Sequence, residues 1–112
     1  MPKESSFQRE VIEKLEAQFP GCVVLKNDPN YIQGIPDLSV FHGLRWGVLE
    51  CKKSDRERYE PNQEYYLDLF NRMSFGAMIC PENEEEIFDA LQRSFSTCRS
   101  TRVSKREQVS LG

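Results

Sequence analysis

Apolar residues near the start of the chain recur with the period of a helix. Over residues 5–19 they occupy every fourth position, at Phe7, Val11, Leu15 and Phe19. Side chains at this spacing lie on one face of an α-helix. The Pro-Gly pair at positions 20–21 ends the pattern. We therefore predict an amphipathic helix over residues 5–19.

The pattern then changes to short β-rich runs separated by turn residues. Residues 22–25, 37–41 and 46–52 are typical of strands, and turn-forming residues concentrate in the segment 27–36. Only residues 42–45 separate the second strand from the third. A connection this short joins antiparallel neighbours, so we predict a hairpin.

Helical and strand patterns alternate in the second half of the chain. We predict a helix over residues 61–73, an apolar strand over residues 77–80 and a third helix over residues 82–95, which starts with an acidic run. The order α-β-β-β-α-β-α predicts an α/β fold with a mixed central sheet and helices on both faces. Large apolar residues become rare after residue 96, so we predict one domain over residues 1–96 and a basic, disordered tail over residues 97–112.

Length and composition are typical of one small soluble domain. The 112 residues are 38% hydrophobic, and no apolar run approaches the roughly 20 residues that span a bilayer. The first residues lack the basic-then-apolar layout of a secretion signal. We therefore expect a soluble, cytoplasmic protein without a membrane partner. The net charge of −3 argues against a broad positive field, although the basic tail leaves the rest of the chain near −6.

Several common kinds of active site are excluded by residue type. His42 is the only histidine, so paired-histidine metal sites and the zincin motif are absent. Neither common phosphate-binding glycine motif occurs, so we expect no nucleotide cofactor. The four cysteines include no C-x-x-C pair, and most lie in apolar stretches as small hydrophobes do. Any catalytic metal must therefore be held by carboxylates.

Two carboxylates and an amine converge in the predicted hairpin. Asp37 starts one strand, and Glu50 and Lys52 lie two apart near the end of the next, so these two project from one side about 6.6 Å apart. Antiparallel pairing sets Asp37 close to Glu50. Such carboxylates suit Mg²⁺ or Mn²⁺, whose other coordination sites go to water and a substrate phosphate. Lys52 would orient or deprotonate the attacking water and offset transition-state charge.

These residues resemble the signature of a known nuclease superfamily. Gly-Ile-Pro-Asp at residues 34–37, with Glu50-Cys51-Lys52 thirteen positions after the aspartate, is similar to the G-x-P-D…E-x-K motif of the PD-(D/E)XK nucleases. The small stand-alone VRR-Nuc branch, related to phage and archaeal Holliday-junction resolvases, resembles it most. The resemblance extends in element order over residues 7–95. It implies a restriction-endonuclease-like core and is compatible with a phage-encoded protein.

The resemblance implies further site residues. The family carries a glutamate on the first helix, and Glu10, at the edge of the apolar stripe, is favoured over Glu13, which lies almost opposite. The family also carries a glutamine at the start of the helix after the Glu-x-Lys strand, and Gln63 matches this position. The resemblance further implies that the backbone carbonyl of Cys51 is a metal ligand. The ordinary alternatives are an exposed Glu10 paired with Lys14 and a Gln63 that only caps its helix.

Contacts to DNA are harder to assign. Lys53, Arg56 and Arg58 follow the Glu-x-Lys strand, but acidic residues interrupt them, so a solvated loop and a phosphate clamp remain open. Four aromatic residues have the same ambiguity between base stacking and core packing, namely Tyr31, Trp46, Tyr59 and Tyr65.

We therefore expect a Mg²⁺- or Mn²⁺-dependent endonuclease that hydrolyses DNA phosphodiester bonds. Asp37, Glu50 and Glu10 would bind the metal, Lys52 would assist the water, and Gln63 would position it. A small domain with one site gains surface by pairing, so we expect a homodimer, and the related resolvases imply selectivity for branched or junction DNA. The alternative is a catalytically inactive DNA-binding module of the same fold, which has no need of carboxylates that repel each other without metal.

Overall fold

The computed structural model describes residues 4–96, which form three helices and four strands. The elements follow the order α1 (Glu4–Gln18), β1 (Val23–Lys26), β2 (Leu38–His42), β3 (Arg45–Cys51), α2 (Gln63–Met73), β4 (Gly76–Ile79) and α3 (Glu84–Ser96). This is the predicted α-β-β-β-α-β-α order. The predicted tail, residues 97–112, lies outside the described residues.

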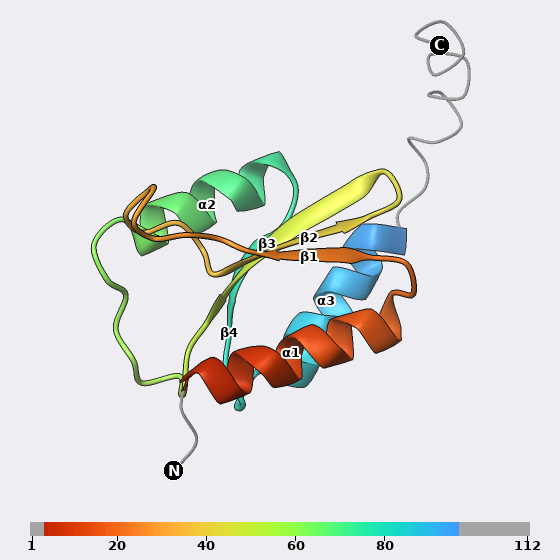
Figure 1. Cartoon of the computed structure of the whole chain (residues 1–112), viewed down its shortest axis with the longest axis horizontal. Helices are drawn as coiled ribbons and strands as arrows, with labels where there is room; N and C mark the ends of the chain where they lie inside the picture. Colours follow the sequence, from red (N-terminus) through yellow and green to blue (C-terminus); the bar gives the residue numbers. More distant parts are fainter. Residues whose placement is uncertain (1–3, 97–112) are drawn as a thin grey trace, which may run out of the picture.

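The strands form one mixed sheet in the order β1-β2-β3-β4 (Figure 1). β1 pairs with β2 and β2 pairs with β3 in antiparallel directions, whereas β4 runs parallel to β3. The β2–β3 pairing confirms the predicted hairpin, whose turn at Gly43 and Leu44 has Gly43 at a positive φ of 62°. The parallel pair is possible because α2 supplies the crossover between β3 and β4.

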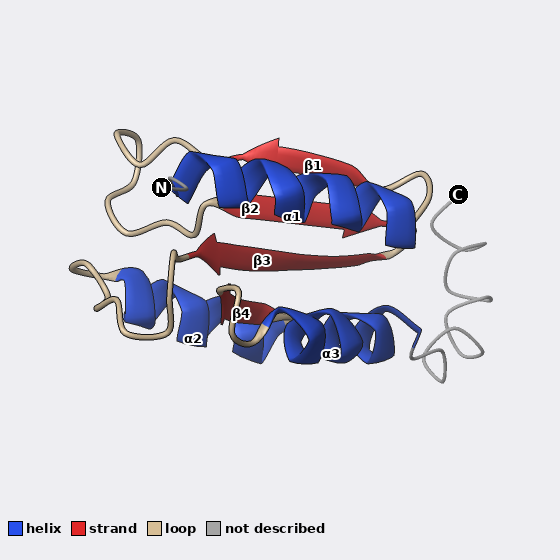
Figure 2. Cartoon of the chain, turned by 90° about the horizontal axis from the view of Figure 1, so that it is seen from below, coloured by secondary structure: helices blue, strands red, loops and turns tan. Residues whose placement is uncertain are grey.

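Helices cover both faces of this sheet. In Figures 1 and 2, α1 and α3 lie together on one face, and α2 lies on the other. Lys14 of α1 pairs with Glu84 of α3 at 2.5 Å, and Gln18 donates to Gln92 Oε1 at 3.0 Å, so the two helices are joined along their polar edges. The molecule is therefore an α/β fold of three layers.

The main core lies between the sheet and the α1–α3 layer. The predicted apolar stripe of α1, Phe7, Val11, Leu15 and Phe19, is buried there. Sheet residues from β2, β3 and β4 meet it, including Leu38, Leu49, Cys51 and Ile79. Because strand side chains alternate, Asp37, Glu50 and Lys52 point to the opposite side, the side that carries α2. Because the apolar face of α1 covers one face of the sheet, these three polar residues lie on the other face.

Element boundaries differ from the predictions by one or two residues. The first strand begins at Val23 instead of residue 22, and α3 begins at Glu84 instead of residue 82. At α3 the reason is local: the carbonyl of Asn83 accepts from the Ile87 amide, and its side-chain oxygen accepts from the Cys80 amide at 2.8 Å. Asn83 therefore stabilises both the turn that precedes α3 and the start of the helix.

Crossing a bilayer requires a long apolar helix, and none of the helices within residues 4–96 meets that requirement.

Candidate active site

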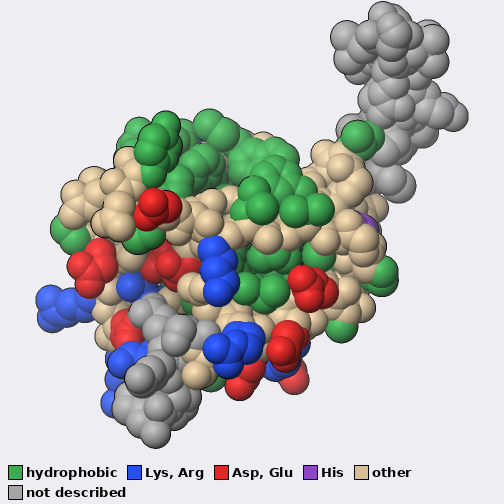
Figure 3. Space-filling view, viewed as in Figure 1, with side chains coloured by type: hydrophobic (Ala, Val, Ile, Leu, Met, Phe, Trp, Pro, Cys, Tyr) green, Lys and Arg blue, Asp and Glu red, His purple; other side chains and the backbone are tan. Residues whose placement is uncertain are grey.

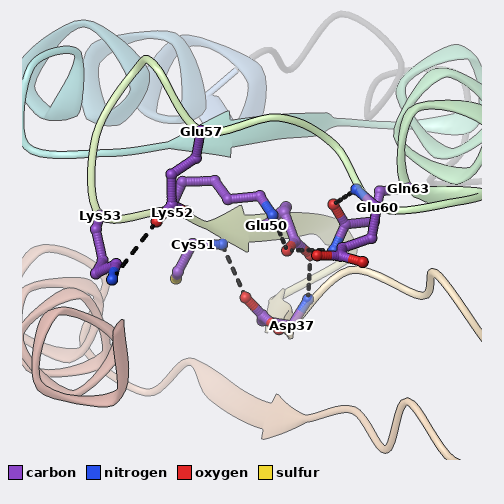
Figure 4. Close-up of polar contacts among 8 residues, drawn as sticks. All are labelled: Asp37, Glu50, Cys51, Lys52, Lys53, Glu57, Glu60 and Gln63. Atoms are coloured by element: carbon purple, nitrogen blue, oxygen red, sulfur yellow. Dashed lines mark hydrogen bonds and ion pairs between the residues drawn. The ribbon is translucent and has the colours of Figure 1, made fainter. Parts of the chain in front are cut away.

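Asp37 and Glu50 face each other across the β2–β3 pair. The register places Leu38 opposite Leu49, so the preceding Asp37 lies opposite Glu50. The Asp37 amide donates to Glu50 Oε1 at 3.2 Å, and the Cys51 amide donates to Asp37 Oδ2 at 2.9 Å (Figure 4). The structure therefore brings Asp37 and Glu50 together as predicted, and a backbone amide of the neighbouring strand binds each carboxylate.

Lys52 completes a buried charge group. Its ammonium Nζ lies 3.7 Å from Glu50 Oε2, as expected for residues two apart on a strand. Glu50 is 2% exposed and Lys52 is 5% exposed, and they are the two charged residues among the buried ones of residues 6–96. The Lys52 amide donates to the Ile79 carbonyl at 2.9 Å, which fixes the end of β3 against β4. Burial of an ion pair at a rigid sheet end is a poor way to gain stability, so it points to chemistry.

Gln63 approaches the Glu50 carboxylate from the far end of the loop between β3 and α2. It is the first residue of α2, and its Nε2 donates to Glu50 Oε2 at 2.8 Å. Its Oε1 accepts from the Glu60 amide at 2.7 Å, so both ends of the side-chain amide are held (Figure 4). The sequence places Gln63 thirteen residues after Glu50, and the structure brings the two together.

Gly34 allows the turn before Asp37 to pack against the start of α2. Its φ is +89°, and an added Cβ would lie 2.5 Å from Asn62 Cβ and 2.7 Å from the Pro61 carbonyl oxygen. Any other residue type would be strained and would push the two segments apart. The glycine of the motif therefore supports the approach of Gln63 to Glu50.

Asn27 is a positioning residue that the sequence pattern marked only as part of a turn. Its backbone amide donates to the Asp37 carbonyl at 2.8 Å, and its Nδ2 donates to the Pro36 carbonyl and to Ser39 Oγ, both at 2.9 Å. These bonds hold the turn that carries Asp37 against the end of β1. An asparagine directly after a strand was the available signal.

The pKa of Asp37 is raised above its ordinary value. Burial of the carboxyl group is the main cause, and the Cys51 amide and the charge of Lys52 oppose it. The folded protein therefore holds a proton on Asp37 at a higher pH than an exposed aspartate does. A cation near the carboxylate would reverse this effect.

The donor set fits a hard divalent cation. Asp37 and Glu50 supply two carboxylates, and the backbone carbonyl of Cys51 is a third oxygen from the same strand end. Mg²⁺ and Mn²⁺ are commonly held by one or two carboxylates, with water and substrate phosphate filling the other positions. Within residues 4–96 no group of three His, Cys, Asp or Glu side chains is placed to hold a metal. Substrate and water oxygens would have to complete the coordination.

Glu10 and Glu13 are both exposed on α1. The first turns of α1 lie beside the end of β3 (Figures 1 and 2), so the helix passes the correct end of the sheet. The structure does not gather either glutamate with Asp37 and Glu50 into a three-carboxylate group. The assignment of Glu10 as a ligand stays a prediction.

The loop between β3 and α2 carries the predicted DNA contacts. Lys53, Arg56 and Arg58 are exposed on it, and Lys53 lies 3.9 Å from Glu57. In Figure 4 this loop runs from Lys53 to Gln63, above Lys52 and Glu50 in the view. Tyr59 lies on the same loop and is 42% exposed. Partial burial of its phenol, together with the charges of Glu64 and Glu50, raises the pKa of this group. The assignment of Lys53, Arg56 and Arg58 as DNA contacts stays a prediction.

The other aromatic candidates divide into packed and exposed residues. Trp46 packs edge-on against Phe70, with ring centres 6.1 Å apart, whereas Tyr65 contacts Tyr66 but is 61% exposed. Tyr31 is 85% exposed on the loop between β1 and β2. Of the four, Tyr31 is the most available for stacking.

A hollow of about 940 Å³ lies away from this site, between α1 and α3. Its lining includes a cluster of carboxylates, namely Glu82, Glu84, Glu85, Glu86 and Asp89. These negative charges repel a phosphate backbone. The hollow between α1 and α3 is therefore a poor candidate for a phosphate-binding site.

Comparisons of this chain with protein-family models, with curated proteins and with solved structures find no match.

Proposed function

We propose that this protein is a Mg²⁺- or Mn²⁺-dependent endonuclease that hydrolyses phosphodiester bonds in DNA. The observation that carries the proposal is the charged group at one end of the sheet, in which Asp37 lies opposite Glu50 and Lys52 Nζ lies 3.7 Å from Glu50 Oε2. A carboxylate pair with one ammonium beside it is the combination that metal-assisted phosphodiester hydrolysis needs. A stability role alone does not account for burying the Glu50–Lys52 pair beside a half-buried Asp37.

The site residues have different proposed roles, which follow from their chemistry. When bound, the metal supplies Lewis-acid stabilisation of charge on the phosphate. Asp37, Glu50 and the Cys51 carbonyl would hold it. The Lys52 amine orients the attacking water, accepts its proton or offsets the charge that develops on the phosphate oxygens. Rigid placement of Lys52 by the Ile79 carbonyl lowers the cost of reaching the reactive geometry.

Gln63 positions groups and carries no charge. Its Oε1 is held by the Glu60 amide and its Nε2 by Glu50. This keeps the Glu50 carboxylate in one orientation, and a small shift of the amide presents the N–H to a water or a phosphate oxygen.

The restriction-endonuclease-like core is part of this proposal. Its support is the element order together with an antiparallel hairpin that carries Asp37 and Glu50 and a parallel β4 beside β3. Selectivity for branched or junction DNA rests on the resemblance to VRR-Nuc and resolvase-like nucleases.

A homodimer is also proposed, and an uncovered apolar face supports it. Val23, Leu25 and Phe41 are exposed on β1 and β2, where α2 leaves the sheet open, and Val23 lies opposite Phe41 in the register. Figure 3 shows hydrophobic side chains gathered over α2 and the neighbouring strands. Apolar patches of this kind are typical of interaction sites.

The test is DNA cleavage by the purified protein. Supercoiled plasmid, flap and four-way-junction substrates are incubated with Mg²⁺, with Mn²⁺ and with chelator, and Lys52→Ala serves as the inactive control. We expect metal-dependent cleavage that the variant lacks. Binding of these DNAs without any cleavage would favour the inactive DNA-binding module instead.

A further inference from the structure

The loop between β1 and β2 forms a pocket beside Asp37. The pocket has a volume of about 480 Å³ and is lined by Asn27, Asp28, Tyr31, Ile32 and Ile35. This volume lies within the range of small-ligand sites, about 300–1,000 Å³. Two aliphatic residues and one aromatic ring form its apolar part, and an amide and a carboxylate form its polar part.

Hydrogen bonds hold this loop in shape without any ligand. The Asp28 carbonyl accepts from the Tyr31 amide at 3.0 Å, Asp28 Oδ1 accepts from the Asn30 amide at 2.9 Å, and the Ile32 carbonyl accepts from the Ile35 amide at 3.2 Å. Asn27 ties the start of the loop to Pro36 and Ser39. The Tyr31 ring, 85% exposed, is thus presented from an ordered backbone. A preorganised loop loses less entropy on binding than a mobile one.

The pocket lies close to the proposed reacting phosphate. Asn27 directly follows β1 and donates through its backbone to the Asp37 carbonyl at 2.8 Å. Neighbouring strands lie about 4.8 Å apart, so the pocket begins about one strand from Asp37 and two from Glu50. This is a distance that a nucleotide next to the reacting phosphate covers.

The charge of the pocket selects a base over a phosphate. Asp28 is exposed at its rim, and its carboxylate repels phosphate while accepting hydrogen bonds from N–H groups. An aromatic ring beside such a carboxylate matches an unpaired base, whose face stacks and whose edge donates. Guanine presents two adjacent donors, N1–H and N2–H, which suit a carboxylate, whereas thymine presents one donor between two acceptors.

On these grounds we propose that this pocket binds an unpaired nucleobase next to the scissile phosphate, with the base stacked on Tyr31 and held at its edge by Asp28, and with guanine preferred. This inference rests on the proposed nuclease function, since it assumes that DNA reaches Asp37 and Glu50. It adds a determinant of substrate choice, because a paired base within an intact duplex has no free face for Tyr31.

The test measures binding separately from cleavage. The probe is a duplex with a short single-stranded overhang that carries the fluorescent base 2-aminopurine, studied with Ca²⁺ in place of Mg²⁺ and again without divalent cation. We expect the parent protein to quench the probe by stacking, and Tyr31→Ala to abolish the quenching and weaken overhang binding about tenfold, with blunt duplex unaffected. The matched control is Leu44→Ala, which truncates a 72% exposed side chain at the far end of the β2–β3 hairpin.

A second variant tests the edge contact. Asp28→Asn keeps an oxygen for the Asn30 amide but replaces the other carboxylate oxygen by a donor. In competition between overhangs that differ only in guanine or thymine, we expect the parent to prefer guanine and Asp28→Asn to lose that preference while quenching persists.

The outcomes separate this proposal from the nuclease proposal. Quenching that survives in Tyr31→Ala, an equal loss in Leu44→Ala, or no quenching by the parent overturns the base pocket even if the parent cleaves DNA. Tyr31-dependent quenching without metal-dependent cleavage supports the pocket and rejects the nuclease.

Discussion

Gln63 donates to Glu50 Oε2 at 2.8 Å, so the first residue of α2 reaches the carboxylate near the end of β3. The Lys52 ammonium lies 3.7 Å from the same oxygen. One carboxylate oxygen is therefore shared by a neutral donor and a cation, and the other accepts from the Asp37 amide. Glu50 is the centre of the polar group, and changes to its partners have distinguishable effects.

Lys52→Ala should reduce DNA cleavage by about 10²–10⁴-fold, the usual contribution of a group that moves a proton in the transition state. Metal binding and DNA binding should be little changed, because the ammonium is not a ligand. Because the side chain is buried, Lys52→Met, which keeps most of its volume, guards against unfolding. Arg72→Ala, which removes an exposed cation in the last turn of α2, is the control. Cleavage by both Lys52 variants at the parental rate would reject the mechanism.

Gln63→Glu should destabilise the protein at neutral pH. The substitution replaces the N–H that faces Glu50 Oε2 by a second carboxylate oxygen, while an oxygen remains for the Glu60 amide. Two facing carboxylates hold a proton more tightly when folded, so the free energy of unfolding should fall as pH rises. Gln63→Ala, which only removes hydrogen bonds, should cost about 1 kcal/mol with little pH dependence. Thermal melts at mildly acidic and mildly alkaline pH compare the two, and identical pH profiles would contradict the contact.

Much of the fold could be predicted because the relevant signals are local. The spacing of Phe7, Val11, Leu15 and Phe19 specified the buried face of α1, and the short connection at residues 42–45 specified the hairpin. With the hairpin known, strand alternation brought Asp37, Glu50 and Lys52 together, as the structure has them.

The contacts between loops could not be predicted in the same way. The approach of Gly34 to Asn62, and the bonds from Asn27 to Pro36 and Ser39, depend on how the turn 27–36 folds over the sheet. No periodicity encodes such contacts, because turn residues report a local backbone shape and not its neighbours. The position of Glu10 relative to Asp37 and Glu50 could not be predicted for a related reason. The helical periodicity gives the direction of the Glu10 side chain relative to the core, but not its distance from β3.

Gly34→Ala should destabilise the protein more than Gly43→Ala. Both glycines have positive φ, so each substitution should cost roughly 1–2 kcal/mol in backbone strain. At Gly43 an added Cβ meets nothing within 4 Å, whereas at Gly34 it lies 2.5 Å from Asn62 Cβ. Overpacking should add about 1–3 kcal/mol at Gly34 alone. Urea unfolding measures the difference, and equal losses would show that the 34–62 contact is loose.

Glu10→Gln should reduce cleavage far more than Glu13→Gln. Both glutamates are exposed on α1, so neither substitution should lower stability by more than about 0.5 kcal/mol. Glu10 borders the packed face of a helix whose first turns lie beside the end of β3. Cleavage rates at saturating Mg²⁺ decide between them. A larger defect from Glu13→Gln would show that the other side of the helix faces the metal.

Stability without metal should fall as pH rises above the ordinary pKa of an aspartate. Burial raises the pKa of Asp37 in the folded protein, so in this range the folded state binds more protons than the unfolded chain. The stabilising contribution of the protonated group is present below the unfolded pKa and is lost as pH rises through the folded one. Asp37→Asn should therefore be more stable than the metal-free parent at neutral pH, and its amide oxygen can still accept from the Cys51 amide.

Added Mn²⁺ should restore the stability that the parent loses at neutral pH. Binding to the folded state alone contributes about 2.7 kcal/mol at a hundredfold excess over Kd. Asp37→Asn should not respond, because it has lost one of the two facing carboxylates, whereas Asp28→Asn, on an exposed loop residue, should respond as the parent does. Thermal melts of the three proteins with and without Mn²⁺ measure both effects. Two results together would contradict this prediction: saturating Mn²⁺ does not change the melting temperature of the parent, and Asp37→Asn is less stable than the metal-free parent. Asp37 would then be a structural turn residue and not a metal ligand.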